Sequence, residues 1–286
     1  MYVKLMAAAR KASCYARVAS LVVTGVAVSG TTVAAGESWP RQVEATYRIA
    51  FNGFNIGTFA FRAHMDGATY SVESEARLSA LLGVLKWHGA SRSTGSLSGL
   101  KAIPSSYRFD FDGTGNTGSI NMRFRHGDVT RVAVVPDKPD SADTVPLRSG
   151  HLKHVIDPLS AVLVMSHAPR GNVCARTIPI FDGKQRFDLS FSYVRQQAIS
   201  EQRPSGQPAV ATVCRVNYLP IAGHRMTKET QHMAKSTGIE VVMRPVPSAG
   251  VYVPYQITVP TVAGSATLTA EQVRIQTRFE QIALIH

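Results

Sequence analysis

The stretch IPIFDGKQRFDLSFSY, residues 178–193, carries the strongest structural signal in the chain. Two runs of alternating apolar residues flank the dipeptide Asp182-Gly183. An Asp-Gly pair between such runs is the strongest short-range indication of a β-hairpin, because both residues tolerate the backbone angles of a tight turn. We therefore predict a β-hairpin at residues 178–193.

The predicted hairpin also contains the densest charged group in the chain. This group consists of Asp182, Gly183, Lys184, Arg186 and Asp188. Alternation places Lys184, Arg186 and Asp188 on one face, opposite Phe187 and Leu189. The charged residues either fix the hairpin against the neighbouring structure or mark a partner surface, or they form an ordinary solvated strand face. The sequence leaves these interpretations open.

Two cysteines lie close to the hairpin in the sequence. Cys174 precedes it and Cys214 follows it, whereas Cys14 falls in a segment that we expect to be removed. An even pair of cysteines in an oxidising compartment forms a disulfide by default. We predict a Cys174–Cys214 bridge, the alternative being two buried free thiols.

Residues 1–35 have the features of a secretory signal peptide. Four basic residues and no acidic residue lie in this segment, followed by a small-residue apolar run and the small-x-small sequence Val33-Ala34-Ala35. The apolar run is shorter than the roughly 20 residues of a membrane span, and Gly25 and Gly30 interrupt it. We expect cleavage, no transmembrane anchor afterwards, and a location in the periplasm of a Gram-negative bacterium.

The charge balance favours anionic partners. The net charge is +12, and removal of residues 1–35 leaves 27 basic against 19 acidic residues, a net charge of +8. A basic surface attracts phospholipid head groups and other acidic envelope components. Export argues against nucleic acid as a partner.

Outside the hairpin, the chain consists mainly of segments with a period of two. Apolar residues alternate through residues 43–51, 59–65 and 70–78, with turns between them, which predicts a three-stranded antiparallel meander. Further strands are expected at residues 87–97, 105–112, 120–124, 129–134, 210–218, 239–244, 251–259 and 266–276. A short helical or irregular crossover is expected at residues 78–85.

The clearest helix signal begins at Asp157-Pro158. Asp157 is a good N-cap and Pro158 suits the first helical position, and an apolar stripe of about three turns follows. The proline-rich stretch 136–150 is the best candidate for a surface loop or a break within the sheet. We predict that residues 36–286 form a single β domain.

Large aromatic residues gather on one face of the predicted strands. The expected apolar face comprises Tyr47, Phe51, Phe59, Phe61, Trp87, Tyr107, Phe109 and Phe111. On a curved sheet such residues line the concave side, where barrel-like sheets hold apolar ligands. The alternative is an ordinary packed core.

The chain contains no catalytic signature that we recognise. His151, His154 and Asp157 have metal-like spacing, but they precede the predicted helix and lack a further ligand, so we expect neither a metal nor a cofactor. A Gly-x-Ser-x-Gly elbow is not formed at residues 95–99, where no helix follows the serine. Carboxylates on strands, such as Asp110 with Asp112, are explained by alternation, although such a pair could serve a glycosidase.

Several segments together resemble a known family. YRIAFNGFNIGTFAFR, GLKAIPSSYRFDF, IDPLSAVLVM and FDGKQRFDLSF, within residues 43–277, resemble exported bacterial proteins catalogued as domain of unknown function 3108. The family has no established activity. In architecture its members are similar to periplasmic lipoprotein carriers and to β-spiral proteins linked to envelope integrity, which is an analogy of fold alone.

We therefore predict a mostly β protein. One long curved antiparallel sheet is expected to form an open barrel or β-spiral around one short central helix. The predicted function is non-enzymatic: a binding or scaffold protein of the cell envelope that holds a lipid-like or anionic ligand, or an envelope protein partner, and supports envelope integrity. The alternatives are a hydrolase acting on an envelope polymer and a purely structural protein-interaction module.

Overall fold

Alternation of apolar and polar side chains places most of the chain in strands, because successive residues of a strand point to opposite faces. The computed structural model describes residues 39–80, 85–137, 139, 141–168 and 171–286. In these residues the first strands are β1 (Gln42–Phe51), β2 (Phe54–Asp66), β3 (Thr69–Ala80), β4 (Leu85–Ser98), β5 (Lys101–Gly113), β6 (Asn116–Arg125) and β7 (Asp128–Val135). The later strands are β8 (Arg176–Phe181), β9 (Arg186–Ala198), β10 (Val210–Ala222), β11 (Glu240–Val246), β12 (Val251–Thr261), β13 (Gly264–Gln276) and β14 (Gln281–Ile285).

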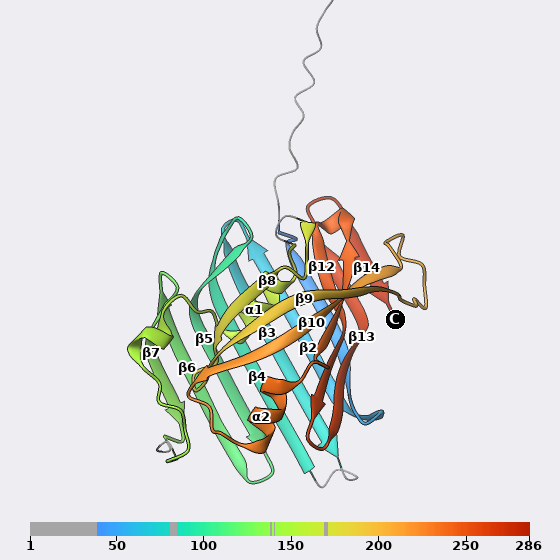
Figure 1. Cartoon of the computed structure of the whole chain (residues 1–286). Helices are drawn as coiled ribbons and strands as arrows, with labels where there is room; N and C mark the ends of the chain where they lie inside the picture. The colour runs from blue at the N-terminus through green and yellow to red at the C-terminus, as the bar shows by residue number, and fades with distance from the viewer. Residues whose placement is uncertain (1–38, 81–84, 138, 140, 169–170) are drawn as a thin grey trace, which may run out of the picture. The chain divides into compact units, whose positions relative to one another are not determined.

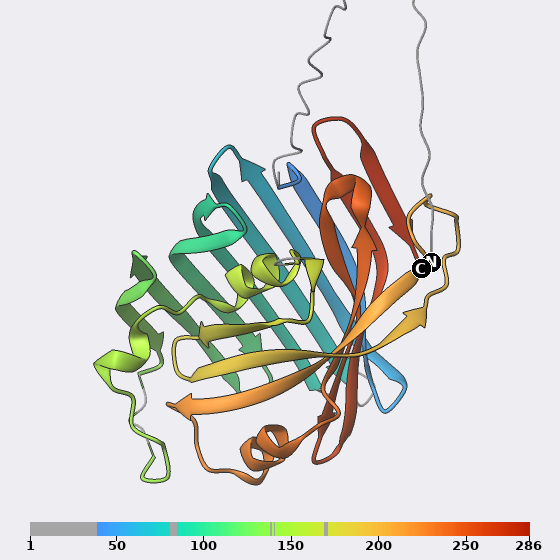
Figure 2. The same cartoon turned by 45° about the horizontal axis from the view of Figure 1, so that its top comes forward.

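These fourteen strands form one antiparallel sheet. Its order is β7-β6-β5-β4-β3-β2-β1-β13-β12-β11-β10-β9-β8, with β14 paired to β13. Within the described residues, no ladder joins the end strands β7 and β8, so the sheet remains open. It curls so that β8, β9 and β10 pass over the face formed by the early strands (Figures 1 and 2). The prediction of a long, curved, open antiparallel sheet is confirmed.

The opening meander forms as the alternation predicts. Tyr47 of β1 lies opposite Phe59 of β2, and Phe59 lies opposite Ala76 of β3. The inward residues Ala45, Tyr47 and Phe61 are buried in the main core. The crossover expected at residues 78–85 is described only in part, because residues 81–84 lie outside the described residues, as does the predicted signal peptide.

Helix α1 (Pro158–Met165) begins where the sequence predicts. The Asp157 carboxylate accepts hydrogen bonds from the backbone amides of Leu159 and Ser160, both at 3.0 Å, and Pro158 occupies the first turn. The eight residues make about two turns, so the expectation of three turns was too long. The helix contacts β3, β4 and β5 on one side and β8 on the other, and it lies inside the curled sheet (Figure 2).

A second helix, α2 (Lys228–Lys235), was not predicted. Thr227 caps it by accepting a hydrogen bond from the Thr230 amide, but none of its residues is buried. The segment is short and strongly polar, with Met233 and Ala234 as its apolar residues, so it offers little apolar signal from which to predict a helix. Short 3₁₀ turns occur at η2 (Ser149–Leu152) and η4 (Pro247–Ala249). The prediction of a single helix is therefore incomplete.

The segment before α1 connects the two ends of the open sheet. The Val155 amide donates to the carbonyl of Gly127, in the turn between β6 and β7, at 3.0 Å. The next residue, Ile156, forms a parallel bridge with Ile180 of β8 through two backbone hydrogen bonds of 3.0 Å. Residues 155–156 thus hold the end strands on either side of the helix.

The β8–β9 hairpin packs its tip against the opposite wall of the sheet. The Asp182 carboxylate accepts hydrogen bonds from the amides of Lys184 (2.8 Å) and Gln185 (2.7 Å), which shapes the turn. Gly183 has a φ of +102°, and a Cβ there would lie 2.2 Å from Cγ2 of Ile120 in β6. Glycine is required both for the backbone angle and for this close approach.

The charges of the hairpin hold its own structure. Arg186 and Asp188 form a 2.5 Å ion pair with little exposure, so this pair is not a solvated face. Lys184 lies in the turn, because β9 begins only at Arg186, and the expected alignment of Lys184 with the strand residues is wrong. Burial raises the pKa of the Asp182 carboxyl group.

Cys174 and Cys214 form a disulfide. Cys174 lies just before the end strand β8, Cys214 lies in β10, and β9 runs between these strands in the sheet. Both cysteines are buried in a second apolar cluster with Ile178 and Phe191. The predicted bridge is confirmed, and the alternative of two free thiols is wrong.

Candidate functional site

An apolar cavity lies between α1 and the middle of the sheet. Its floor is formed by the adjacent strands β2, β1, β13 and β12. Its volume is about 80 Å³. The lining residues are Trp39, Pro40, Val43, Ala45, Tyr47, Phe59, Phe61, Met65, Val162, Leu163, Met165, Ser166, Val251, Tyr252, Val253, Pro254, Ile257, Leu268 and Val273. None of these carries a charge, so a bound group must itself be apolar.

Trp39 and His167 pack together beside this cavity. The Trp39 indole N–H donates to the Gly99 carbonyl at 2.8 Å, and its ring centroid lies 3.8 Å from that of His167. Burial lowers the pKa of His167 to about 4. The imidazole is therefore neutral at neutral pH and adds no charge.

The half-buried side chain of Arg176 lies next to the last turn of α1. Nη1 of Arg176 donates to the carbonyl of Val164, which lies between the lining residues Leu163 and Met165. Among the described residues, Nε and Nη2 of Arg176 have no hydrogen-bond acceptor, although both atoms are buried. Burial lowers the pKa of Arg176 to about 10, so the group still carries its charge at neutral pH. Buried N–H groups of a cation that lack an acceptor are costly, and an anionic ligand would remove that cost.

The eight aromatic residues expected on one ligand face lie in different places. Tyr47, Phe59 and Phe61 line the cavity. Trp87, Phe109 and Phe111 form a separate aromatic row, with ring centroids 6.3 and 5.5 Å apart. Tyr107 is buried in the main core, and Phe51 is half-buried at the end of β1. The structure thus brings three of the eight residues to the cavity.

A polar cluster is buried beneath the start of α1. The Asp157 carboxylate accepts from the hydroxyls of Ser93 (2.9 Å) and Ser160 (2.5 Å), and Ser160 lies 2.6 Å from the Tyr70 hydroxyl. Asp157, Ser93 and Ser160 are fully buried, and burial raises the pKa of Asp157. The cluster joins the helix to β3 and β4, and we interpret it as structural.

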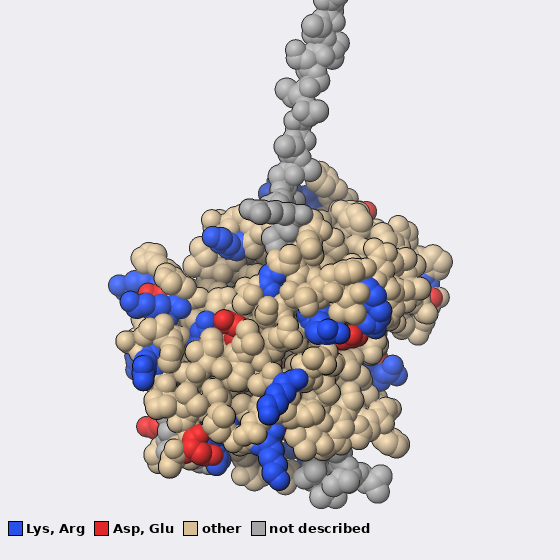
Figure 3. Space-filling view, in the orientation of Figure 1, with Lys and Arg blue, Asp and Glu red and all other residues tan. Residues whose placement is uncertain are grey.

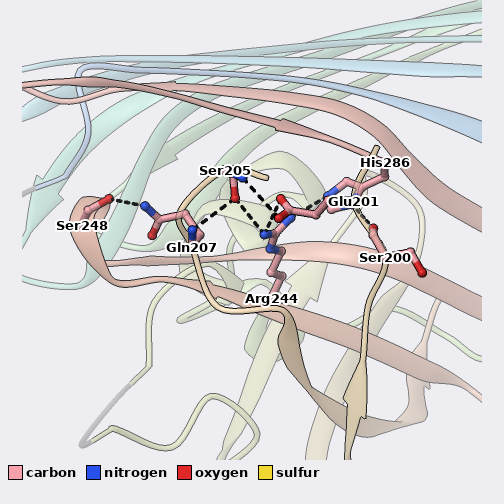
Figure 4. A network of polar contacts seen from close by, with 7 residues as sticks. All are labelled: Ser200, Glu201, Ser205, Gln207, Arg244, Ser248 and His286. Atoms are coloured by element: carbon pink, nitrogen blue, oxygen red, sulfur yellow. Dashed lines mark hydrogen bonds and ion pairs between the residues drawn. The ribbon is translucent and has the colours of Figure 1, made fainter. Parts of the chain in front are cut away.

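A second buried network surrounds Arg244 of β11 (Figure 4). Nη2 of Arg244 donates to Oε1 of Glu201 at 2.6 Å and to the Ser205 hydroxyl at 3.0 Å, and Nη1 lies 3.2 Å from Nε2 of His286. Nδ1 of His286 lies 3.0 Å from the Ser200 carbonyl. The network fastens the loop between β9 and β10 to β11 and β14. Sequence reasoning missed Arg244, although a lone charge within the apolar run VVMRPV is a usable signal.

The residues considered for catalysis do not converge. Asp110 pairs with Arg108 at 2.6 Å and Asp112 accepts from Thr117 at 2.7 Å, both on the exposed face. His151 accepts from the Arg148 amide, His154 is exposed, and Asp157 is buried in the cluster described above. In the described ranges, no three His, Cys, Asp or Glu residues are grouped to hold a metal.

Comparison with known proteins places the chain in a family. The family described as "Protein of unknown function (DUF3108)" matches residues 46–271. The chain belongs to this family. No curated protein and no solved structure matches the chain. Family membership therefore agrees with the resemblance seen in the sequence and assigns no activity.

The surface of the protein carries scattered charge. Lys and Arg are spread over the face seen in Figure 3, with fewer Asp and Glu and broad uncharged areas between them. Among the described residues, no helix has the length and apolar character needed to span a bilayer.

Proposed function

We propose that the protein binds a single-chain anionic amphiphile of the fatty-acid class, with the alkyl chain in the cavity beneath α1 and the carboxylate on Arg176. The observations that carry this proposal are the uncharged, apolar cavity beneath α1 and the guanidinium of Arg176. The guanidinium donates to the Val164 carbonyl of that helix, and two of its buried nitrogens have no acceptor among the described residues. Ligand sites typically combine an apolar lining with a few polar groups that orient the ligand.

The size of the cavity favours one alkyl chain. Its volume of about 80 Å³ is well below the roughly 300–1,000 Å³ of sites that enclose drug-sized molecules. Part of one alkyl chain fits such a space, whereas a diacyl lipid requires α1 to move away from the sheet. Apolar cavities of this kind stay dry and take up apolar groups.

The polar end of the site favours a carboxylate. Within the described part of the chain, Nε and Nη2 of Arg176 keep their N–H groups unused, and a carboxylate accepts two parallel hydrogen bonds from a guanidinium. The hydroxyl-bearing residues Ser166 and Tyr252 line the same cavity. The disulfide suits an oxidising compartment, and with the predicted signal peptide it supports a periplasmic carrier or scaffold of the cell envelope.

Replacing Arg176 by glutamine tests the head-group contact. We expect affinity for palmitate to fall about tenfold or more, because a hydrogen bond to a charged group contributes about 1.5–3 kcal/mol. Affinity for hexadecanol, which lacks the carboxylate, is expected to change little. Isothermal titration and native mass spectrometry measure both ligands, and Arg203→Gln on the exposed surface is the control. Equal losses for the acid and the alcohol would contradict a head-group role for Arg176.

A substitution that fills the cavity tests whether the alkyl chain of the ligand binds there. Ala45 lines the cavity, and Ala45→Phe is expected to reduce the binding of palmitate and hexadecanol alike by at least about tenfold, because the alkyl chain loses its space. Ala60→Phe makes the same change on the outer face of β2 and is expected to leave binding intact. Full binding by a folded Ala45→Phe variant would exclude this cavity. Failure of the wild type to bind either ligand would refute the ligand function and favour an interaction module.

A further inference from the structure

The outer face of β4–β7 carries four arginines in two facing pairs. The strand registers place Arg92 opposite Arg108 and Arg123 opposite Arg131. They also place Ser106 between Thr94 and Arg123, and Asn121 next to Arg108. We call Arg92, Arg108, Arg123 and Arg131 the arginine block. It surrounds a shallow depression of about 540 Å³ whose lining contains no acidic residue.

The two arginine pairs differ in whether acidic side chains neutralise their charge. Arg92 pairs with Glu73 at 3.0 Å, and Arg108 pairs with Asp110 at 2.6 Å. Arg123 and Arg131 have no carboxylate within 4.0 Å among the residues that the structure describes. Like charges directly opposite each other on a sheet are destabilising. The block therefore retains two uncompensated positive charges at a cost to the fold.

We propose that the arginine block binds a phosphate monoester group. Side chains directly opposite on neighbouring strands have Cβ atoms about 5 Å apart, so the guanidinium groups of one pair can reach a single anion. Arginine binds phosphate oxygens through paired hydrogen bonds and has no acceptor of its own. The hydroxyls of Thr94 and Ser106, 2.8 Å apart, can supply further donors at the edge of the depression.

Charge matching favours a phosphate monoester over a single carboxylate or a phosphodiester. A phosphate monoester carries a charge of about −1.5 to −2 at neutral pH, which balances the two uncompensated arginines. A single carboxylate or phosphodiester leaves one of these charges unbalanced. The site lies on the opposite face of the sheet from the apolar cavity, so it does not depend on the proposed fatty-acid function.

The double variant Arg123→Gln/Arg131→Gln tests the site. Titration with inorganic phosphate and co-sedimentation with phosphatidylcholine vesicles, with and without phosphatidic acid, provide the two probes. We expect at least a tenfold loss of affinity for whichever probe the wild type binds. Arg203→Gln/Arg278→Gln removes the same charge from two other exposed positions and is expected to retain binding.

The two probes distinguish the sources of the phosphate. Binding of both supports recognition of a lipid head group, and binding of inorganic phosphate alone supports a small soluble phosphate. Failure of the wild type to bind either probe overturns the proposal, as does equal binding by the two double variants. Removing a like-charge pair should leave the melting temperature of Arg123→Gln/Arg131→Gln at or above that of the wild type, so a loss of binding will not reflect unfolding.

Discussion

Replacing Asp157 by alanine is expected to lower the free energy of unfolding by about 3 kcal/mol. The carboxylate caps α1 through the amides of Leu159 and Ser160 and accepts from the hydroxyls of Ser93 and Ser160. Loss of a helix N-cap costs about 1 kcal/mol, and leaving a buried hydroxyl without its acceptor costs about 1–3 kcal/mol. Urea unfolding followed by circular dichroism measures the change.

Two other substitutions separate the causes of this loss. Asp157→Asn keeps the oxygen that accepts from the helix amides, so it should retain much of the stability. Ser93→Ala removes one donor from the strand side and should cost about 1 kcal/mol. An Asp157→Ala variant as stable as the wild type would show that the cluster does not hold the helix on the sheet.

The same carboxyl group predicts a dependence of stability on pH. Burial raises the pKa of Asp157, so the folded protein holds this proton more firmly than the unfolded chain. Its contribution to stability is fully present below the ordinary pKa of 3.8 and is lost as the pH rises through the raised value. An asparagine side chain does not titrate, so the stability of Asp157→Asn relative to the wild type should increase as the pH is raised from about 4 to about 7.

Urea unfolding at several pH values measures this difference. Asp182 also has a raised pKa and contributes with the same sign in both proteins, so it cancels in the comparison. If the difference in free energy of unfolding between the wild type and Asp157→Asn stayed constant across this pH range, the pH dependence could not be assigned to Asp157.

Local patterns in the sequence were sufficient to predict most of the fold. The alternation through β1–β3, the Asp182-Gly183 turn and the Asp157-Pro158 helix start each depend on residues that are neighbours in the chain. The helix α2 was missed because its sequence KETQHMAK is short and strongly polar and offers little apolar signal. Local rules therefore succeed where short-range chemistry decides the conformation.

The candidate site depends on contacts between distant segments. The partners of Asp157 include Ser93, 64 residues away, and Ser160 in turn contacts Tyr70, 90 residues away. Alternation predicted that Phe59 and Phe109 share the inner face, but only the position of α1 decides which of them borders a cavity. Likewise, Nε and Nη2 of Arg176 lack an acceptor among the described residues only because of how distant segments pack around them.

Removing the disulfide is expected to have the largest effect on stability. Cys174 and Cys214 are separated by 40 residues, and closing a loop of that length stabilises the fold by about 4 kcal/mol in the chain-entropy model. The bridge also fastens the segment before β8, which within the described residues is joined to the rest of the sheet by its ladder to β9 and to the segment before α1 by the Ile156–Ile180 bridge. The Cys174→Ala/Cys214→Ala variant should therefore unfold at a much lower urea concentration, and the reduced wild type should behave similarly.

The disulfide should affect stability without affecting the ligand site directly. Neither cysteine lines the cavity, although the bridge lies in an apolar cluster that shares Met165 with the cavity lining. At temperatures where Cys174→Ala/Cys214→Ala is still folded, its affinity for palmitate should therefore equal that of the wild type. A variant that keeps its stability would refute the predicted role of the bridge in holding the end strand. A folded variant that loses binding would show that the position of β8, and with it Arg176, depends on the covalent link.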